Sequence, residues 1–459
     1  MSDAPSSPAW QTELAVTLRL AAPLAAANLL QMLVYAMDVI FVARLGEQAL
    51  AASSLAVALF GLLMWSFSGL TGMVAALISA ELGRRRHAVR EVRRSTRMGL
   101  WLSVLCGIVT MVICLFGQEI MLLTGQEPEI ARRAGDFLQV VMWAAIPMIA
   151  SNVLRSFVSA LGRPIFATAI TGLAVGVSAL ANYAFVFGRL GAPALGLEGS
   201  ALASVVTAFV MLGTYAVAIM GDRRLARYRI FGNWWRPEWQ RFRELVRTGT
   251  PVALTILAEA GLFSGAAFLM GRIGSSELAG HTIALQVAAL AFQVPFGIGQ
   301  AATIQVGYHY GAGNRAGLGR AGWIAILLAI GFMGVPAAVM LFAPELVLGI
   351  YVDTRAPENA ALVAFAVRFM VVAAAFQLFD GIQAVGAGAL RGLQDTRVPM
   401  IYALFGYWGP GLGTAIVLGF FTPLAGIGIW LGLAAGLVVV AALMLQRWMR
   451  RDALGLTSS

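Results

Sequence analysis

About twelve runs of twenty or more mostly apolar residues divide the chain, and they limit its possible folds more than any other feature of the sequence. A helix of about 20 apolar residues crosses the roughly 30 Å hydrocarbon core of a bilayer. Only 12% of the residues are charged, about half the share in an ordinary soluble domain. These features predict an all-α integral membrane protein with twelve transmembrane helices, and they argue against a soluble enzyme.

The arginines predict how the chain is oriented in the membrane. All 32 basic residues are arginines, and alternate assignment of the loops places 25 of them on one side. Basic residues concentrate in cytoplasmic loops, so both termini and the long central loop are expected in the cytoplasm. The positive charge thus reflects topology, and nucleic acid is not an expected partner. The expected spans are approximately residues 20–43, 49–82, 95–117, 134–158, 165–187, 197–220, 249–272, 278–308, 321–342, 361–388, 398–420 and 424–446.

An internal repeat organises the chain. A shift of 228 positions aligns residues 23–86 with residues 251–314 without a gap. Because each copy holds six spans, an even number, the two six-helix lobes are expected to be parallel, with the substrate path between them. A duplication with a tightly packed interface is the other interpretation. The expected segments are an N-terminal tail (1–19), an N-lobe (20–221), a cytoplasmic basic linker (222–248), a C-lobe (249–446) and a C-terminal tail (447–459).

Three acidic residues fall inside expected spans: Asp38, Glu259 and Asp380. A charge at the bilayer centre costs at least about 2.5–3.5 kcal/mol. No basic side chain is expected at mid-span to pair with these acids, so a proton, a metal cation or a cationic substrate must neutralise them. Competition among these three is the basis of an exchanger. The alternative is that each carboxyl stays protonated and hydrogen-bonded to a neighbouring helix.

Polar residues in other spans are candidates to share a site with Asp38. Ser178 and Asn182 are four residues apart and so lie on one helical face. Ser204 lies in the next span. Carboxylate, amide and hydroxyl oxygens suit a hard monovalent cation or a proton. Such residues also link membrane helices without any role in transport.

Two further features belong to the second half of the chain. Gln286, Gln293 and Gln300 are spaced by seven and lie on nearly one face of a helix, where they line a pore or pack against a neighbouring helix. Phe376 comes one turn before Asp380 and could present its ring face to an organic cation.

These residues resemble those of the multidrug and toxic compound extrusion (MATE) transporters, in the NorM-like branch. The resemblance covers nearly the whole chain. It is carried by PLAAANLLQMLVYAMDVIFVARLG (23–46), ANYAFVFG (181–188), Glu259 in TILAEAGLF, and DGIQAVGAGALRGLQDT (380–396), the most specific of these motifs.

The resemblance implies a V-shaped antiporter that expels small organic cations in exchange for Na⁺ or H⁺. It assigns Glu259 and Asp380 to a C-lobe cation site and Asp38 and Asn182 to an N-lobe site. Phe376 and Gln286, singled out above by their positions in the sequence, are further candidates for the C-lobe site. Na⁺ could bind at Asp38 or at the Glu259 and Asp380 pair.

The chain departs from the family pattern at three of its candidate residues. Ser178 stands where the family often has Asn, Ser204 where it often has Thr, and Phe376 where similar transporters have Tyr. Because Phe376 offers no oxygen, H⁺ is slightly favoured as the coupling ion. We expect a monomer in the bacterial inner membrane, in contact with lipid and without a cofactor.

Two other functions are considered. A lipid-linked oligosaccharide flippase of a related two-lobed fold would carry an anionic pyrophosphate and would need basic residues in its cavity, whereas the expected mid-span charges are acidic. A membrane receptor would not need unpaired carboxylates. No phosphate-binding loop occurs in the expected cytoplasmic segments, so an ion gradient rather than ATP is the expected energy source.

Overall fold

The computed structural model describes residues 7–457, and it is helical throughout its regular segments. Within those residues, twelve helices are long and apolar enough to cross a membrane, and each of the twelve expected spans corresponds to one of them. The backbone N–H and C=O groups of a helix bond to each other, which is why an apolar chain of this kind is stable as helices in hydrocarbon. The predicted all-α membrane fold is confirmed.

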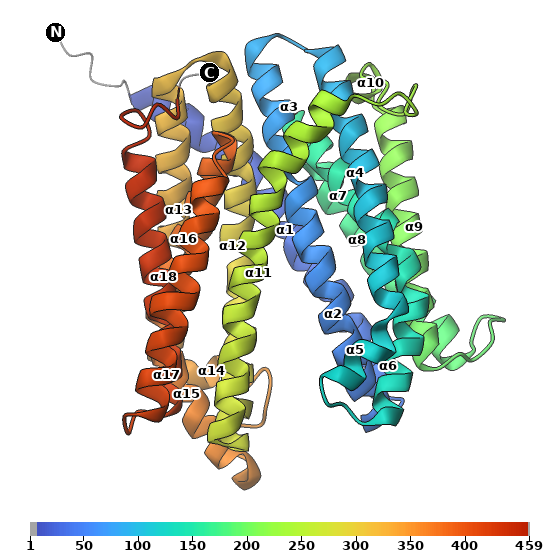
Figure 1. Ribbon diagram of the computed structural model, residues 1–459, viewed down its shortest axis with the longest axis vertical. Coiled ribbons are helices and arrows are strands. Elements are labelled where there is room, and N and C mark those ends of the chain that lie inside the picture. Colours follow the sequence, from blue (N-terminus) through green and yellow to red (C-terminus); the bar gives the residue numbers. More distant parts are fainter. Residues whose placement is uncertain (1–6, 458–459) are drawn as a thin grey trace. The chain divides into compact units, whose positions relative to one another are not determined.

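The chain forms two compact units. The N-terminal unit comprises Ala26–Ala253, and the C-terminal unit comprises the residues through Ala25 together with those from Leu254 onward. The boundaries therefore fall inside two long helices, α1 (Ser7–Ala43) and α11 (Trp239–Ile273). Figure 1 shows the long helices within each unit running side by side.

The N-terminal unit holds most of the first half of the chain. Besides the parts of α1 and α11 that belong to it, its helices are α2 (Glu47–Thr71), α3 (Met73–Arg84), α4 (Val89–Leu115), α5 (Gly117–Leu123), α6 (Pro128–Val141), η1 (Met142–Ala144), α7 (Ala145–Ala160), α8 (Ile165–Phe187), α9 (Leu197–Gly221) and α10 (Arg223–Ala226).

The C-terminal unit holds the remaining helices. They are α12 (Ser275–Ala312), α13 (Arg315–Phe342), α14 (Pro344–Leu348), η2 (Pro357–Asn359), α15 (Ala360–Gly392), α16 (Arg397–Gly406), the π-helix η3 (Tyr407–Gly411), α17 (Leu412–Phe420) and α18 (Gly426–Met449).

The first helix is longer than the expected span. α1 begins at Ser7, so residues 7–19, which were expected to form a tail, are its first turns. In the C-terminal unit, the half-buried Nε2 of His309 on α12 lies 3.3 Å from the Glu13 carboxylate and gives these turns a polar partner. Residues 1–6 of the expected tail lie outside the described residues.

The helix of the second span is interrupted at Gly72, about two thirds of the way along it. There α2 ends and α3 begins, with the backbone N–H of Gly72 donating to the carbonyl of Ser68 at 2.8 Å. From α7, the Asn152 amide donates to the same carbonyl at 3.0 Å. The Ser68 carbonyl thus keeps its helical partner across the interruption and also accepts a bond from a side chain of a neighbouring helix, which links α7 to this point.

Small residues bring α18 against α17 and η3. On α18, Gly428, Gly432 and Gly436 are spaced by four and so share one face. A Cβ atom at Gly432 would lie 2.4 Å from the backbone nitrogen of Ala415, and one at Gly436 would lie 3.0 Å from the Cα atom of Gly411. Close backbone approach through small residues is a main source of helix association in membranes.

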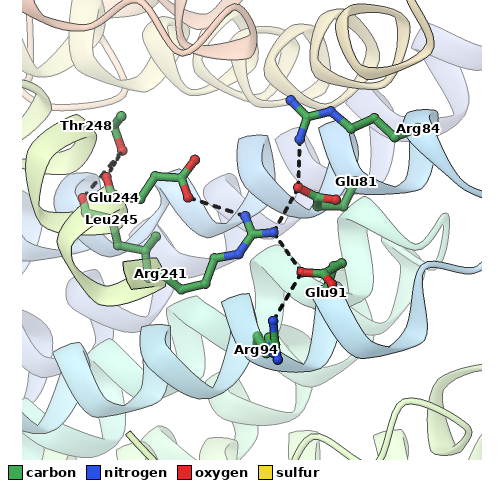
Figure 2. Close-up of polar contacts among 8 residues, drawn as sticks. All are labelled: Glu81, Arg84, Glu91, Arg94, Arg241, Glu244, Leu245 and Thr248. Carbon is green, nitrogen blue, oxygen red and sulfur yellow. Dashed lines mark hydrogen bonds and ion pairs between the residues drawn. The ribbon is translucent and has the colours of Figure 1, made fainter. Parts of the chain in front are cut away.

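Arg241 ties the start of α11 to α3 and α4 within the N-terminal unit (Figure 2). Its Nη2 lies 3.0 Å from Glu81 Oε1 and 2.9 Å from Glu91 Oε2, and its Nη1 lies 3.3 Å from Glu244 Oε2. Arg84 adds a second positive charge 2.9 Å from Glu81. Because Arg241 is only 17% exposed, these pairs are screened less than surface pairs, and their shared geometry fixes where α11 starts.

We predict that Gly432→Ala destabilises the protein by about 1–3 kcal/mol, the usual cost of forcing extra atoms into a packed interface. The measurement is the thermal unfolding midpoint of the purified protein in detergent. Gly413→Ala on α17 is the matched control, because a Cβ atom there would meet nothing within 4 Å. Equal unfolding midpoints for Gly432→Ala and the wild type would show that this close approach contributes nothing to stability.

Candidate functional site

A polar cluster surrounds Asp38 in the N-terminal unit. Asp38 comes from α1, Ser178 and Asn182 from α8, and Ser204 from α9. The Asn182 amide donates to Asp38 Oδ1 at 2.8 Å, Ser178 Oγ lies 3.4 Å from the same oxygen, and Ser204 Oγ lies 3.3 Å from Oδ2. Three helices therefore bring together the four residues that the sequence singled out around this acid.

The Asn182 amide has a second feature. Its nitrogen also donates to the Ser178 carbonyl at 2.9 Å, so the amide is held in place from its own helix. Its Oδ1 is buried and has no hydrogen-bond partner among residues 7–457. A buried acceptor without a partner is rare in proteins and calls for a bound donor, water or cation. The cluster thus offers carboxylate, amide and hydroxyl oxygens in one place.

Sequence reasoning missed Tyr35 in this cluster. The Tyr35 hydroxyl group interacts electrostatically with Asp38 and hydrogen-bonds to the side chain of Gln31. Tyr35 is three residues before Asp38 on α1, and i,i+3 neighbours share a helix face. This spacing in the sequence could have identified Tyr35 as a neighbour of Asp38.

Glu259 and Asp380 meet in the C-terminal unit. Glu259 lies on α11 and Asp380 on α15, and their carboxyl groups are close enough for their charges to interact. Asp380 is buried at 5% exposure, and its Oδ1 has no hydrogen-bond partner within the described part of the chain. Two like charges in one buried place cannot both be ionised without a compensating cation.

The face of α15 around Asp380 is polar. Gln377 and Gln383 flank Asp380 at a spacing of three residues, and both are buried. Among residues 7–457, both amide atoms of Gln377, Oε1 of Gln383 and the hydroxyl group of Tyr407 in η3 lack hydrogen-bond partners. Tyr407 also interacts electrostatically with both acids. Such groups are normally satisfied by ordered water or by an ion. The sequence analysis did not single out these two glutamines, although their spacing of three residues on either side of Asp380 places them on the same helix face.

Arg391 corrects one expectation from the sequence. It was assigned to a loop, and no basic side chain was expected to pair with the three acids. In the structure Arg391 lies in the last turn of α15, and its charge interacts with that of Glu259. The expectation is wrong for Glu259 because α15 continues to Gly392, beyond the expected end of the span at residue 388.

Phe376 belongs to an aromatic cluster. Its ring is 1% exposed and makes edge contacts with Phe263, at 6.1 Å between centroids, and with Trp430, at 5.6 Å. On its other side Trp430 contacts His281 at 5.4 Å. These rings form an apolar wall one turn from Asp380. Gln286 on α12 is exposed, and within residues 7–457 the structure gives no hydrogen bond from it to Glu259 or Asp380, so its role stays a prediction.

The two clusters have different chemistry. Asp38 is surrounded by neutral donors and oxygens, whereas Glu259 and Asp380 lie beside a guanidinium and several unsatisfied polar atoms. Within residues 7–457, no group of three or more His, Cys, Asp or Glu side chains forms a site suited to a metal ion. Carboxyls placed within a membrane span are groups that can take up a proton or pair with a monovalent cation.

A comparison with a family model divides the chain into two halves, as the internal repeat does. The model described as MatE matches residues 23–184 and again residues 251–417. The two matched segments start 228 residues apart, which is the offset of the internal repeat. Together they cover more than half of the chain.

Similar proteins extend this match to nearly the full length. A Mesorhizobium japonicum protein named "Probable multidrug resistance protein NorM" is 45% identical over 443 residues, which are 96% of this chain and 95% of that protein. A Brucella suis protein of the same name is 43% identical over 441 residues, covering 96% and 94%. The crystal structure of a eukaryotic MATE transporter has the same fold, with a TM-score of 0.85 at 20% identity over 98% of this chain and 99% of that one. The protein therefore belongs to the MATE family of membrane transporters, in its NorM-like branch, and is not an enzyme.

Proposed function

We propose that this protein is a secondary active multidrug exporter of the bacterial inner membrane, which expels lipophilic organic cations in exchange for H⁺ or Na⁺. The names of its bacterial relatives support multidrug export over the oligosaccharide flippase. The observation that carries the exchange mechanism is the pairing of the buried carboxyl of Asp380 with that of the half-buried Glu259, beside polar atoms without partners in the described part of the chain.

The charge of the clusters supports a cationic substrate. All three acids lie on membrane-spanning helices, away from bulk water, where a substrate cation and a carboxylate attract each other much more strongly than in water. An anionic substrate would meet repulsion from the same carboxylates. Lipophilic cations also suit a cavity with apolar walls and few fixed donors, because such a cavity recognises charge and apolar bulk.

We favour H⁺ as the coupling ion at the Glu259 and Asp380 pair. Phe376 supplies no oxygen ligand there, and the guanidinium of Arg391 already provides a positive charge next to Glu259. A second fixed cation at this pair would be repelled by Arg391, whereas a proton forms a covalent O–H bond and needs no further ligands. The Asp38 cluster has amide and hydroxyl oxygens, and no arginine is among the described groups that act on Asp38, so it is the better candidate for Na⁺.

The arrangement in the membrane follows from the arginines. We propose that both termini and the loop between α9 and α11 face the cytoplasm, because 25 of the 32 arginines fall on that side. We also propose that the transporter acts as a monomer, with the lobes bounded near residues 221 and 249.

Asp380→Asn and Glu259→Gln are each expected to abolish coupled efflux while the protein still inserts in the membrane. The amides keep the shape of the carboxyls but cannot gain or lose a proton or pair with a cation. The measurement is ethidium efflux from cells, with membrane levels checked by immunoblot. Glu358→Gln is the control, because that carboxylate is exposed outside the long helices. Full drug resistance conferred by either variant would remove the pair from the mechanism.

Asp38→Asn is expected to reduce the efflux rate at least about tenfold, because the neutral side chain ends the ion exchange that the cluster performs. The rate should be measured in proteoliposomes from pH 5.5 to 8.5. Glu47→Gln, an exposed carboxylate at the start of α2, is the matched control. Transport by Asp38→Asn at the wild-type rate across this pH range would leave the cluster with a structural role only.

The coupling ion is tested by imposing the two gradients separately. In inverted vesicles, with the potential clamped by valinomycin and K⁺, a pH gradient alone is expected to drive uptake of the drug. For a monovalent drug exchanged one for one no net charge moves, so the potential, worth about 2.3 kcal/mol per charge per 100 mV, contributes nothing. Uptake driven by a Na⁺ gradient at constant pH, and unaffected by a pH gradient, would overturn the assignment of H⁺.

A further inference from the structure

The segment between α9 and α11, residues 222–238, has one apolar side and one basic side. Leu225, Tyr228 and Ile230 are buried, and the ring of Tyr228 makes an edge contact with Phe157 of α7 at 5.8 Å. The arginines of the segment, by contrast, are exposed. The exposed arginines of the segment are Arg223, Arg224, Arg227, Arg229 and Arg236. We call this segment the basic loop, and Figure 1 shows it at the end of α9.

Side chains of α4 hold the basic loop in place. Arg93 donates to the Tyr228 carbonyl at 2.7 Å, Arg97 donates to the Gly232 carbonyl at 2.8 Å, and Trp101 donates to the Trp234 carbonyl. These three donors are spaced by four along α4 and so share one face of the helix. Because these carbonyls are neutral, the bonds themselves do not neutralise either guanidinium, although Glu238 offsets part of the charge of Arg97.

Tryptophans extend the same surface. Trp234, Trp235 and Trp239 are 55%, 63% and 56% exposed. The ring of Trp239 is fixed by edge contacts with Trp101, at 6.1 Å between centroids, and with Phe242, at 5.8 Å. The loop joins the ends of two membrane-spanning helices, and tryptophan at such a place favours the level of the lipid headgroups.

The charge of this surface is strongly positive. The charge of Arg97 interacts unfavourably with those of Arg93, Arg94 and Arg236, and favourably only with that of Glu238 among the groups that act on it. The two acids of the loop are already engaged, since Asp222 lies 3.6 Å from Arg163 and Glu238 lies 3.5 Å from Arg94. A set of like charges held together in this way is stabilised by an external anion.

We propose that the basic loop and the first turn of α11 form a binding surface for the phosphate headgroups of anionic phospholipids, with the exposed tryptophans inserted at headgroup level. Basic residues next to spanning helices each gain roughly 1 kcal/mol from an anionic leaflet. The rigid attachment to α4 keeps the arginines and tryptophans on one surface before lipid binds, which lowers the entropy lost on binding. This surface is independent of the transport mechanism proposed above.

The proposal is tested by native mass spectrometry of the purified full-length protein in detergent, titrated with dioleoylphosphatidylglycerol or with dioleoylphosphatidylcholine. The wild type is expected to bind phosphatidylglycerol more tightly. The triple variant R223Q/R224Q/R236Q should lose at least about tenfold in affinity for phosphatidylglycerol. R223K/R224K/R236K should retain most of it, because the charge is kept. W234A/W235A should weaken the binding of both lipids.

The control carries the same change in charge elsewhere. R44Q/R189Q/R355Q neutralises three exposed arginines in other loops, and its affinity for phosphatidylglycerol should equal that of the wild type. Inorganic phosphate and a short single-stranded oligonucleotide are the competing probes. Equal affinity for the two lipids, undiminished binding by the glutamine variant, an equal loss in the control, or tighter binding of either competing probe would each overturn the proposal.

Discussion

Hydrocarbon offers no hydrogen-bond partners, and this constraint underlies every level of the structure. It forces the backbone into helices, and it explains why the Asn152 amide donates to a backbone carbonyl where α2 gives way to α3. It also makes an ionised side chain costly wherever no partner is built in. Each of the three carboxyls on the spanning helices therefore needs a group that compensates its charge. The two units supply different compensating groups.

The two halves of the repeat meet this requirement differently. In the N-terminal unit, amide and hydroxyl groups from α8 and α9 surround Asp38. In the C-terminal unit, Glu259 and Asp380 lie beside Arg391 and the hydroxyl group of Tyr407. At the offset of 228, Gln31 stands opposite Glu259 and Ala266 opposite Asp38. Duplication thus supplied the same helices twice, and later substitutions gave each copy its own polar chemistry.

Arginine has a different role in each of three places. Arg241 joins three carboxylates and fixes the start of α11. The charge of Arg391 interacts favourably with that of Glu259 within the membrane-spanning part of the chain. Arg93 and Arg97 bond to backbone carbonyls and so hold the basic loop while keeping their charge. Because guanidinium has several donors in a planar fork and is always charged, it can bond to neutral groups and still attract anions. The number of arginines alone did not distinguish these uses.

The sequence by itself determined the membrane fold, its twelve spans and the repeat, because length and apolar content decide what can cross a bilayer. It also identified Asp38, Ser178, Asn182 and Ser204, which the structure brings into one cluster. Tertiary structure alone decided which helix faces meet. It revealed the charge interaction of Arg391 with Glu259, the unpartnered atoms of Gln377 and Tyr407, and the attachment of the basic loop to α4. Periodicity within one helix defines a face, but only packing between helices determines what that face contacts.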